Sequence, residues 1–179
     1  MELLTFSTAR RASLLGILFF GICPAQVFNE YHVKAVFLYT FAKFVEWPPL
    51  TFSGPASPMT ICILGDDPFG SFLNEAVTGK TAGDRPVTVR RVTDLREAGA
   101  CQILFIAASE TNRMPILLVS VAHPGVLTVG DTADFTAQGG VIGLRRDGDR
   151  IRLSVNLPAA EKAKLRISSR VLSLATLIR

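Results

Sequence analysis

Two continuous apolar runs in the middle of the chain constrain its fold more than any other feature. Residues 60–65 and 102–107 consist mostly of aliphatic, β-branched and aromatic side chains. A strand with one face in water alternates apolar and polar residues, so a run without alternation predicts a strand that is covered on both faces. The sequence therefore predicts a mainly parallel sheet that lies between two layers of helices.

Segments with helical spacing separate the expected strands. Apolar residues recur at helical spacing over residues 31–47, where Lys34 and Lys43 leave a polar side, and Pro48 is expected to end this helix. The same patterns predict further helices at 69–77 and 114–121, and further strands at 86–91 and 126–129. The alternation of strands and helices supports an α/β domain.

The C-terminal part of the chain predicts a different arrangement. Strands at 141–144 and 150–156 are expected to form an antiparallel hairpin at one edge of the sheet, with Asp147-Gly148 in the turn. A long amphipathic helix is expected over residues 159–179. The complete expectation is a three-layer α/β domain with a mainly parallel central sheet, flanking helices, an edge hairpin and a long C-terminal helix.

The first 25 residues have the organisation of a secretory signal peptide. The basic pair Arg10-Arg11 precedes an apolar run over residues 12–23, and the small residue Ala25 follows. The run is roughly a dozen residues long, which is shorter than the ~20 residues of a membrane-spanning helix. We expect cleavage after Ala25 and export to the periplasm, with an uncleaved anchor or a buried helix as the alternatives.

Residues 26–179 are then expected to form one globular domain, because they have the size of a single ordinary core. The whole chain has 19 Lys and Arg against 15 Asp and Glu, a net charge of +4 that is spread along the sequence. Nucleic-acid binding requires a stronger and more clustered basic surface, so we do not expect it.

Two cysteines, Cys62 and Cys101, remain after the expected cleavage. An even pair in an exported protein predicts a disulfide. The bond would close a loop of about forty residues, for which the chain-entropy treatment gives roughly 4 kcal/mol of stabilisation. The alternative is a pair of reduced, buried cysteines that act as small apolar side chains.

Acidic residues follow three of the expected strands. The carboxyl ends of parallel strands lie along one edge of a sheet, where ligands tend to bind. This edge is a weak candidate site for a cation or a polar ligand, formed by Asp66, Asp67, Glu110 and Asp131. The favoured alternative is that these residues cap helices and form turns, where Asp and Ser are common for backbone hydrogen-bonding reasons.

Catalytic signatures are not evident. The histidines of the chain, His32 and His123, have no neighbour at metal-ligand spacing. The sequence also contains no Gly-rich phosphate loop and no Gly-x-Ser-x-Gly nucleophile elbow. We therefore expect a protein that binds a partner, without catalytic residues, metal or cofactor.

The expected hairpin offers a candidate surface for a protein partner. A strand at a sheet edge presents unpaired N–H and C=O groups to another chain. The predicted contact residues are Ile142, Leu144, Arg152 and Ser154, and an ordinary solvated edge is the alternative.

Several blocks of sequence carry a family resemblance. The first three are VKAVFLYTFAKFVEWP at 33–48, ICILGDDPFG at 61–70 and RPVTVRR at 85–91. Others follow in order: 101–106 with Ser109-Glu110, 126–131 with Phe135 and Gly139-Gly140, 152–156, and 167–170. Together they resemble the YfiR-like family of exported bacterial proteins over essentially the whole chain after the signal peptide.

The resemblance implies a periplasmic α/β protein without known catalysis that tends to form homodimers. The best-known member represses a membrane-bound diguanylate cyclase by contacting its periplasmic region, and an outer-membrane lipoprotein sequesters that repressor. Cys62 and Cys101 match one cysteine pair of this member. A second pair, expected between Phe135 and Gly143, is absent here, which puts redox switching through that bond in doubt.

Two functional hypotheses follow from the sequence. The first is a non-catalytic periplasmic protein that restrains a diguanylate cyclase and so limits cyclic di-GMP and biofilm formation. The alternative is a periplasmic sensor that binds a small ligand or a metal at the strand-end acids. Similar domains occur fused to sensor kinases, so a sensor kinase is the alternative partner.

Overall fold

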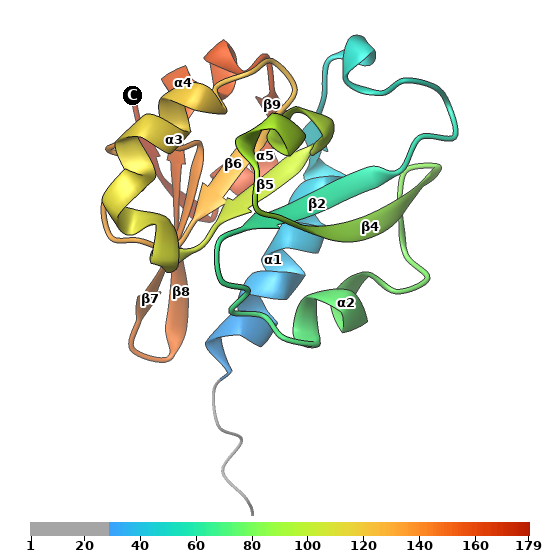
Figure 1. Ribbon diagram of the computed structural model, residues 1–179. Coiled ribbons are helices and arrows are strands. Elements are labelled where there is room, and N and C mark those ends of the chain that lie inside the picture. The colour runs from blue at the N-terminus through green and yellow to red at the C-terminus, as the bar shows by residue number, and fades with distance from the viewer. Residues whose placement is uncertain (1–28) are drawn as a thin grey trace, which may run out of the picture.

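The continuous apolar runs form adjacent parallel strands at the centre of one sheet, as predicted (Figure 1). The computed structural model describes residues 29–179, so the expected signal peptide at 1–25 lies outside the described residues. Strands β2 (Met59–Leu64) and β5 (Ile103–Ile106) pair with Ile61 beside Ile103, and every residue of both is buried. Burial on both faces explains why neither strand alternates in polarity.

The sheet has eight described strands in the order β10-β8-β7-β6-β5-β2-β4-β3. The strands beside β2 and β5 are β3 (Thr81–Ala82), β4 (Arg85–Val92), β6 (Leu127–Gly130), β7 (Ile142–Asp147), β8 (Arg150–Asn156) and β10 (Ala175–Ile178). The pairs β7–β8 and β3–β4 are antiparallel, and the other pairs are parallel. The predicted three-layer α/β fold with a mainly parallel sheet is confirmed.

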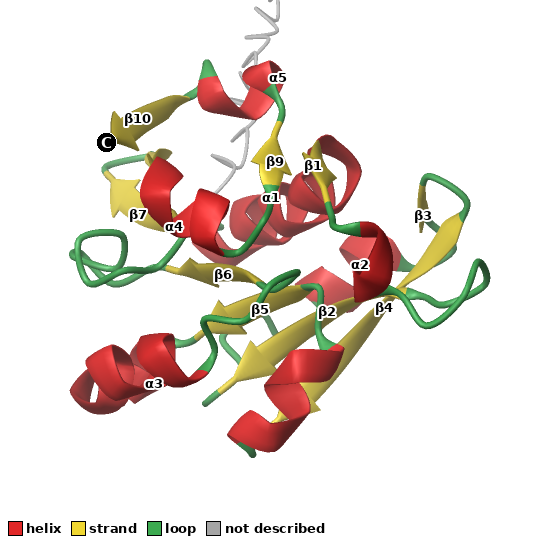
Figure 2. Cartoon of the chain, turned by 90° about the horizontal axis from the view of Figure 1, so that it is seen from above, coloured by secondary structure: helices red, strands yellow, loops and turns green. Residues whose placement is uncertain are grey.

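Helices cover the two faces of the sheet and enclose two apolar clusters (Figure 2). The larger cluster contains side chains of α1 (Glu30–Phe44), α2 (Phe72–Val77), α4 (Leu157–Lys162) and α5 (Ser169–Leu172). The smaller cluster lies on the other face, under the short helices η2 (Leu95–Ala100) and η3 (Ala108–Arg113) and under α3 (Met114–Ser120). Neighbouring residues of a strand point to opposite clusters, because side chains alternate across a sheet.

Helix α1 starts and ends for local reasons that the sequence contains. The side chain of Asn29 caps its N-terminus by accepting a hydrogen bond from the backbone of His32. The helix ends at Phe44, before Pro48, because β1 (Val45–Glu46) turns to pair with β9 (Arg166–Ile167). A further 3₁₀ turn, η1 (Pro49–Thr51), follows. Over residues 29–179, no helix combines the length and apolar character that crossing a membrane requires.

The predicted long C-terminal helix over 159–179 is wrong. Helix α4 ends at Lys162, and Lys164 adopts a left-handed conformation that stops any continuation. The remainder forms strand β9, the single turn α5 and strand β10. These residues instead extend existing strands, since β9 pairs with β1 and β10 pairs with β8.

The prediction that the β7–β8 hairpin lies at an edge of the sheet is also wrong. Strand β8 is covered along residues Leu153–Asn156 by β10, which runs parallel to it. The hairpin itself forms as predicted, with Asp147 opposite Arg150 and Gly148 at a positive φ of 60° in the turn. Strand β10 is the edge strand instead.

A disulfide joins Cys62 of β2 to Cys101, which follows η2, as predicted. The two Cα atoms are 5.8 Å apart, and both residues are at most 1% exposed. The bond crosses the smaller apolar cluster and fastens η2 to the centre of the sheet. This position makes the bond a structural element of the core.

Replacing both cysteines, Cys62→Ala and Cys101→Ala, is expected to lower the free energy of unfolding by roughly 4 kcal/mol. The reason is that the unfolded chain regains the freedom of the open loop. Chemical denaturation measures the effect, and a reductant should destabilise the wild-type protein but leave the double variant unchanged. Equal stability of the two oxidised proteins would contradict a structural role.

Candidate functional site

The carboxyl ends of β2 and β5 meet where the sequence predicted a ligand crevice. Gly65 follows β2 with a positive φ of 90°, and a Cβ built on it would lie 2.5 Å from the Ser109 hydroxyl. The Ser109 hydroxyl accepts a hydrogen bond from the backbone N–H of Asp66, at 2.9 Å. The side chains of Ser109 and Glu110 therefore occupy the space directly above the strand ends.

The four strand-end acids are not brought together into one site. Asp67 pairs with Arg91 at 2.7 Å, Glu110 pairs with Arg113 at 2.5 Å, and Asp66 is exposed. Within residues 29–179, no group of three His, Cys, Asp or Glu side chains could hold a metal ion. In this arrangement, Asp67 also caps the turn before α2 by accepting a hydrogen bond from the backbone of Phe69.

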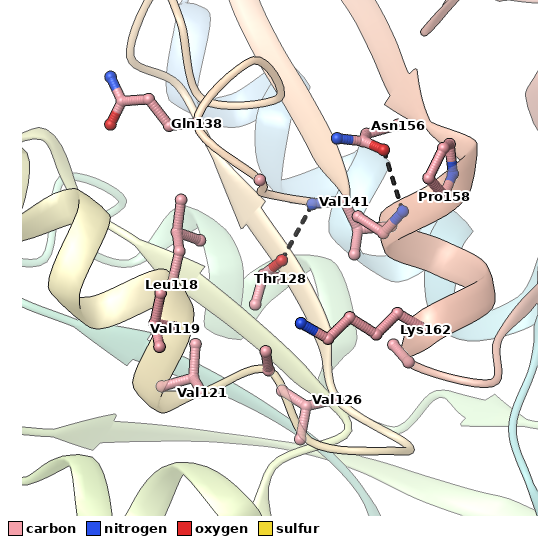
Figure 3. Close-up of a pocket in the computed structure, with 14 residues that line it drawn as sticks. Leu118, Val119, Val121, Val126, Thr128, Gln138, Val141, Asn156, Pro158 and Lys162 are labelled. Atoms are coloured by element: carbon pink, nitrogen blue, oxygen red, sulfur yellow. Dashed lines mark hydrogen bonds between the residues drawn. The ribbon is translucent and has the colours of Figure 1, made fainter. Parts of the chain in front are cut away.

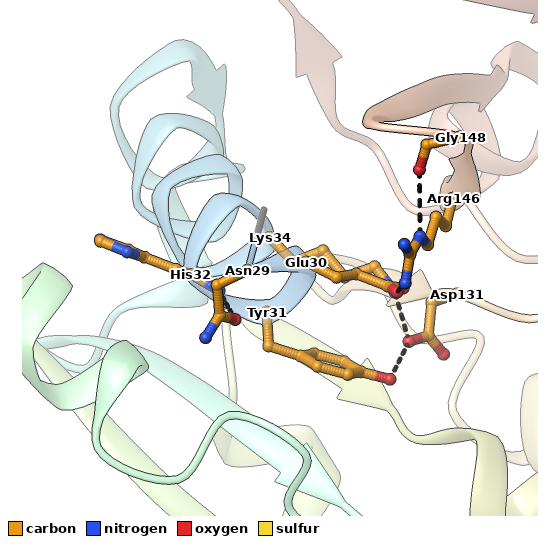
Figure 4. A network of polar contacts seen from close by, with 8 residues as sticks. All are labelled: Asn29, Glu30, Tyr31, His32, Lys34, Asp131, Arg146 and Gly148. Carbon is orange, nitrogen blue, oxygen red and sulfur yellow. Dashed lines mark hydrogen bonds and ion pairs between the residues drawn. The ribbon is translucent and has the colours of Figure 1, made fainter. Parts of the chain in front are cut away.

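The fourth acid, Asp131, belongs to a buried polar network that reaches α1 (Figure 4). Its Oδ2 atom accepts hydrogen bonds from Lys34 Nζ at 2.7 Å and from the Tyr31 hydroxyl at 3.0 Å. Lys34 also pairs with Glu30, one helical turn earlier, and its ammonium group lies 4.5 Å from the centre of the Tyr31 ring. The network fixes the first turns of α1 to the end of β6.

The same network extends to the β7–β8 hairpin. Arg146 of β7 makes an ion pair with the other carboxylate oxygen of Glu30, at 3.5 Å, and donates a hydrogen bond to the carbonyl of Gly148 in the turn. Figure 4 shows the hairpin side chain pointing toward the start of α1. One cluster of charges therefore positions three segments: the N-terminal turns of α1, the end of β6 and the hairpin tip.

Lys34 is 1% exposed, although the sequence placed it on the polar side of the helix. Burial of an ammonium group is tolerated only with paired charges and hydrogen bonds, and here two carboxylates supply them. The i,i+4 spacing of Glu30 and Lys34 was the available sequence signal. The more important partner, Asp131, is 97 residues away and could not be found by local pattern.

The environment of Tyr31 favours its neutral form. Burial and the nearby Asp131 carboxylate raise the pKa of Tyr31 above its ordinary value near 10, and the hydrogen bond to Asp131 acts in the same direction. The phenol therefore keeps the proton that it donates to Asp131. This bond, the Phe69 ring in edge contact with Tyr31 and the Lys34 contacts hold the ring in one place.

A separate cavity of about 290 Å³ lies between α3, β6 and α4 (Figure 3). Its walls are mostly apolar and include Leu118, Val121, Val126 and Val141. Figure 3 shows the side chain of Lys162 extending from α4 across this space. Cavities of this size and lining bind small molecules in many proteins, with a few polar groups to orient them.

Two polar side chains of the cavity have hydrogen-bond partners within the protein, and two others are exposed to solvent. Thr128 accepts a hydrogen bond from the backbone of Val141, and Asn156 bonds to the backbones of Ala159 and Thr136. Lys162 and Gln138 also line the cavity and are exposed. An apolar wall beside an ammonium group suits a small apolar molecule that carries an acidic group. Sequence reasoning missed this cavity, because its walls come from segments far apart in the chain.

The residues predicted to contact a partner separate into two classes. Ile142 and Leu144 are fully buried in the larger apolar cluster, so their side chains cannot reach another protein. Arg152 is exposed on the opposite face of the sheet. Ser154, also on that face, is partly buried and lies 3.2 Å from the Thr136 hydroxyl. Only Arg152 and Ser154 remain candidates for a contact surface.

A comparison with family models matches nearly all of the described residues. The model of the YfiR/HmsC-like family aligns with residues 31–176, which run from the second residue of α1 to the second residue of β10. A comparison with curated protein sequences finds no match.

The solved structures that match this chain are distant. A conserved domain protein from Vibrio cholerae O1 biovar eltor has 11% identity and a TM-score of 0.48, and the match covers 68% of this chain. An ABC domain in complex with L-Trp, from Streptococcus pneumoniae, has 11% identity and a TM-score of 0.46, with 67% of this chain covered. This chain spans 55% of the length of each of these proteins.

Replacing the buried lysine, Lys34→Met, is expected to lower the free energy of unfolding by about 3–5 kcal/mol. The substitution keeps an unbranched apolar side chain but leaves the Asp131 and Glu30 carboxylates without their shared cation. Addition of Asp131→Asn should restore part of the loss by removing one of these charges. Lys43→Met, on the exposed last turn of α1, is the matched control and should change stability by less than about 0.5 kcal/mol.

The Tyr31 pKa predicts a specific loss of stability in alkali. Below pH ~10 both the folded and the unfolded protein hold the phenol proton, so the stabilisation is complete. Above that pH the unfolded chain releases the proton first, and the stability falls as the pH rises toward the folded-state pKa. Denaturation curves at about pH 9 and pH 11 should show a smaller loss for Tyr31→Phe than for the wild type. Tyr39→Phe is the control, and an equal loss in Tyr31→Phe and wild type would contradict the assignment.

Proposed function

Because this chain belongs to the YfiR/HmsC-like family, we propose that it is a non-catalytic regulatory protein of the periplasm that restrains a membrane-bound diguanylate cyclase. The observation that carries the proposal is the family match over residues 31–176. The expected signal peptide at 1–25 supports the location. Under this proposal, the protein limits the production of cyclic di-GMP and therefore biofilm formation.

The proposed mechanism is steric. The domain docks on the periplasmic region of the cyclase and favours its inactive arrangement. Such a protein must present a surface of fixed shape, and the buried network around Lys34 supports this by tying the hairpin to α1 and β6. Exposed Arg152 and its neighbour Ser154 are the contact residues that we retain from the sequence prediction.

Release from the cyclase requires a competitor with different affinity for the free and docked states. An outer-membrane lipoprotein is the proposed competitor, and a homodimer is the proposed form of the free protein. A sensor kinase in place of the cyclase remains the alternative partner, because the fold itself does not determine which signalling enzyme is bound.

The cavity between α3, β6 and α4 favours a second candidate function, that of a small-ligand sensor. Its apolar walls and the Lys162 ammonium group are suited to a small organic acid, whereas the strand-end acids do not form a common site. Because α4 contributes to the cavity and leads into β9, α5 and β10, a bound ligand would stabilise the C-terminal part of the sheet.

Deletion of the gene is expected to raise cellular cyclic di-GMP and biofilm mass, because the cyclase loses its restraint. Cyclic di-GMP is quantified by mass spectrometry in the deletion strain and in the strain complemented with the intact gene. A version without residues 1–25 should fail to complement, because it stays in the cytoplasm. Unchanged cyclic di-GMP in the deletion strain would remove the proposed function.

The sensor function predicts a shift of the thermal midpoint with a small ligand, since binding to the folded state stabilises it by mass action. The screen covers amino acids, nucleotides and divalent ions. Ala122→Trp places a large ring at the exposed wall of the cavity and should abolish the shift, whereas Ala56→Trp, in a distant exposed turn, should retain it. A shift that persists in Ala122→Trp would place the ligand elsewhere.

A further inference from the structure

Strand β10 leaves one edge of the sheet open. It pairs with β8, and no other strand in residues 29–179 lies along its outer side. Figure 2 shows β10 at the outer end of the sheet, next to the C-terminus. Edge strands are commonly protected by charges, prolines or very short length. The opposite edge strand, β3, has only two residues, whereas the four residues of β10 (ATLI) contain neither a charge nor a proline.

The sheet face beside this edge is polar and open. A groove of about 480 Å³ crosses it, with Arg145 of β7, Arg152 and Ser154 of β8, and Thr176 of β10 on its walls. Gly143 also lines the groove, and a Cβ at this position would lie 2.5 Å from the Ser154 hydroxyl, so glycine keeps this part of the groove open. The opposite face of the same strands packs against α1 and α5 in the larger cluster.

Two arginines oppose each other in this groove. Arg145 and Arg152 are direct cross-strand partners in the β7–β8 pairing. Like charges in this position are destabilising unless an acidic group lies between them. Asp147 accepts a hydrogen bond from Arg152 at 2.8 Å, and within residues 29–179 no ion pair engages Arg145. Asp134 also lines the groove but makes no ion pair with either arginine in this part of the chain.

We propose that β10 binds an extended segment of the partner protein as an additional strand, with an acidic side chain of that segment directed at Arg152. The inference rests on the proposed function, because it requires a protein partner. Backbone hydrogen bonds along a sheet edge provide affinity in this mode of recognition, and alternate side chains provide specificity.

The geometry sets the character of the segment. Successive side chains of a strand point to opposite faces, so acidic residues at every second position would face the groove. The added strand would lie roughly 10 Å from β8, a distance that an extended arginine and a glutamate bridge together. If a carboxylate of the partner segment bound Arg152, Asp147 would pair with Arg145 instead. Arg145 lies two residues earlier on the same face of β7.

The test uses the mature protein and two fluorescent eight-residue peptides, one alternating Glu with Val and one alternating Lys with Val. Fluorescence anisotropy should show binding of the Glu peptide, with the Lys peptide at least about tenfold weaker. Hydrogen exchange should show new protection of those amides at residues 175–178 that face away from β8. Equal affinity of the two peptides, or binding without protection of β10, would overturn the proposal.

Arg152→Gln should weaken binding of the Glu peptide about tenfold. Arg113→Gln, which removes the exposed ion pair of η3 with Glu110, is the matched control and should bind normally. If β10 is instead covered by a second copy of this chain, its amides become protected as the protein concentration rises without any peptide, and the proposal fails.

The two proposals fail in different ways. Absence of peptide binding together with a normal rise in cyclic di-GMP on gene deletion overturns the strand-addition site alone. An unchanged cyclic di-GMP level on deletion overturns the proposed function, and with it the assignment of the segment to a regulated partner.

Discussion

A single buried ammonium group, that of Lys34, connects the parts of this domain that its proposed function needs. It lies between the carboxylates of Glu30 and Asp131, and the second oxygen of Glu30 extends the cluster to Arg146 in the hairpin. A buried charge without partners is far more costly than a buried apolar side chain. The helix start, the end of β6 and the hairpin are therefore held in one mutual arrangement.

The sheet divides into a fully covered half and a half with one open face. Around β2, β5 and β6, both faces are packed, and the disulfide between Cys62 and Cys101 lies inside the smaller cluster. Around β7, β8 and β10, one face is packed under α1 and the other carries the polar groove. The disulfide lies in the covered half, and the half with exposed arginines and an open edge carries the surface that we propose for a protein partner.

Local and chemical patterns in the sequence predicted the features that they determine, whereas long-range strand pairing decided the others. The apolar runs predicted the central parallel strands because strand composition is a local property, and the cysteine pair predicted the disulfide because paired cysteines in an exported protein tend to be oxidised. The helical pattern at 159–179 was misleading, because Ala175 and Leu177, which fit an apolar helix face, also lie on one face of the short strand β10. The edge assignment of the hairpin failed for the same reason, since β10 covers β8.

The sequence by itself determined the fold class, the central strands and the resemblance to one family, because hydrophobic periodicity and short motifs are properties of neighbouring residues. Only the tertiary structure decided that Lys34 is buried, that Ile142 and Leu144 are core residues, and that the strand-end acids have separate partners. It also created the cavity beside Lys162 and the open edge at β10. Each of these features depends on contacts between segments far apart in the chain, and local sequence patterns carry no information about such contacts.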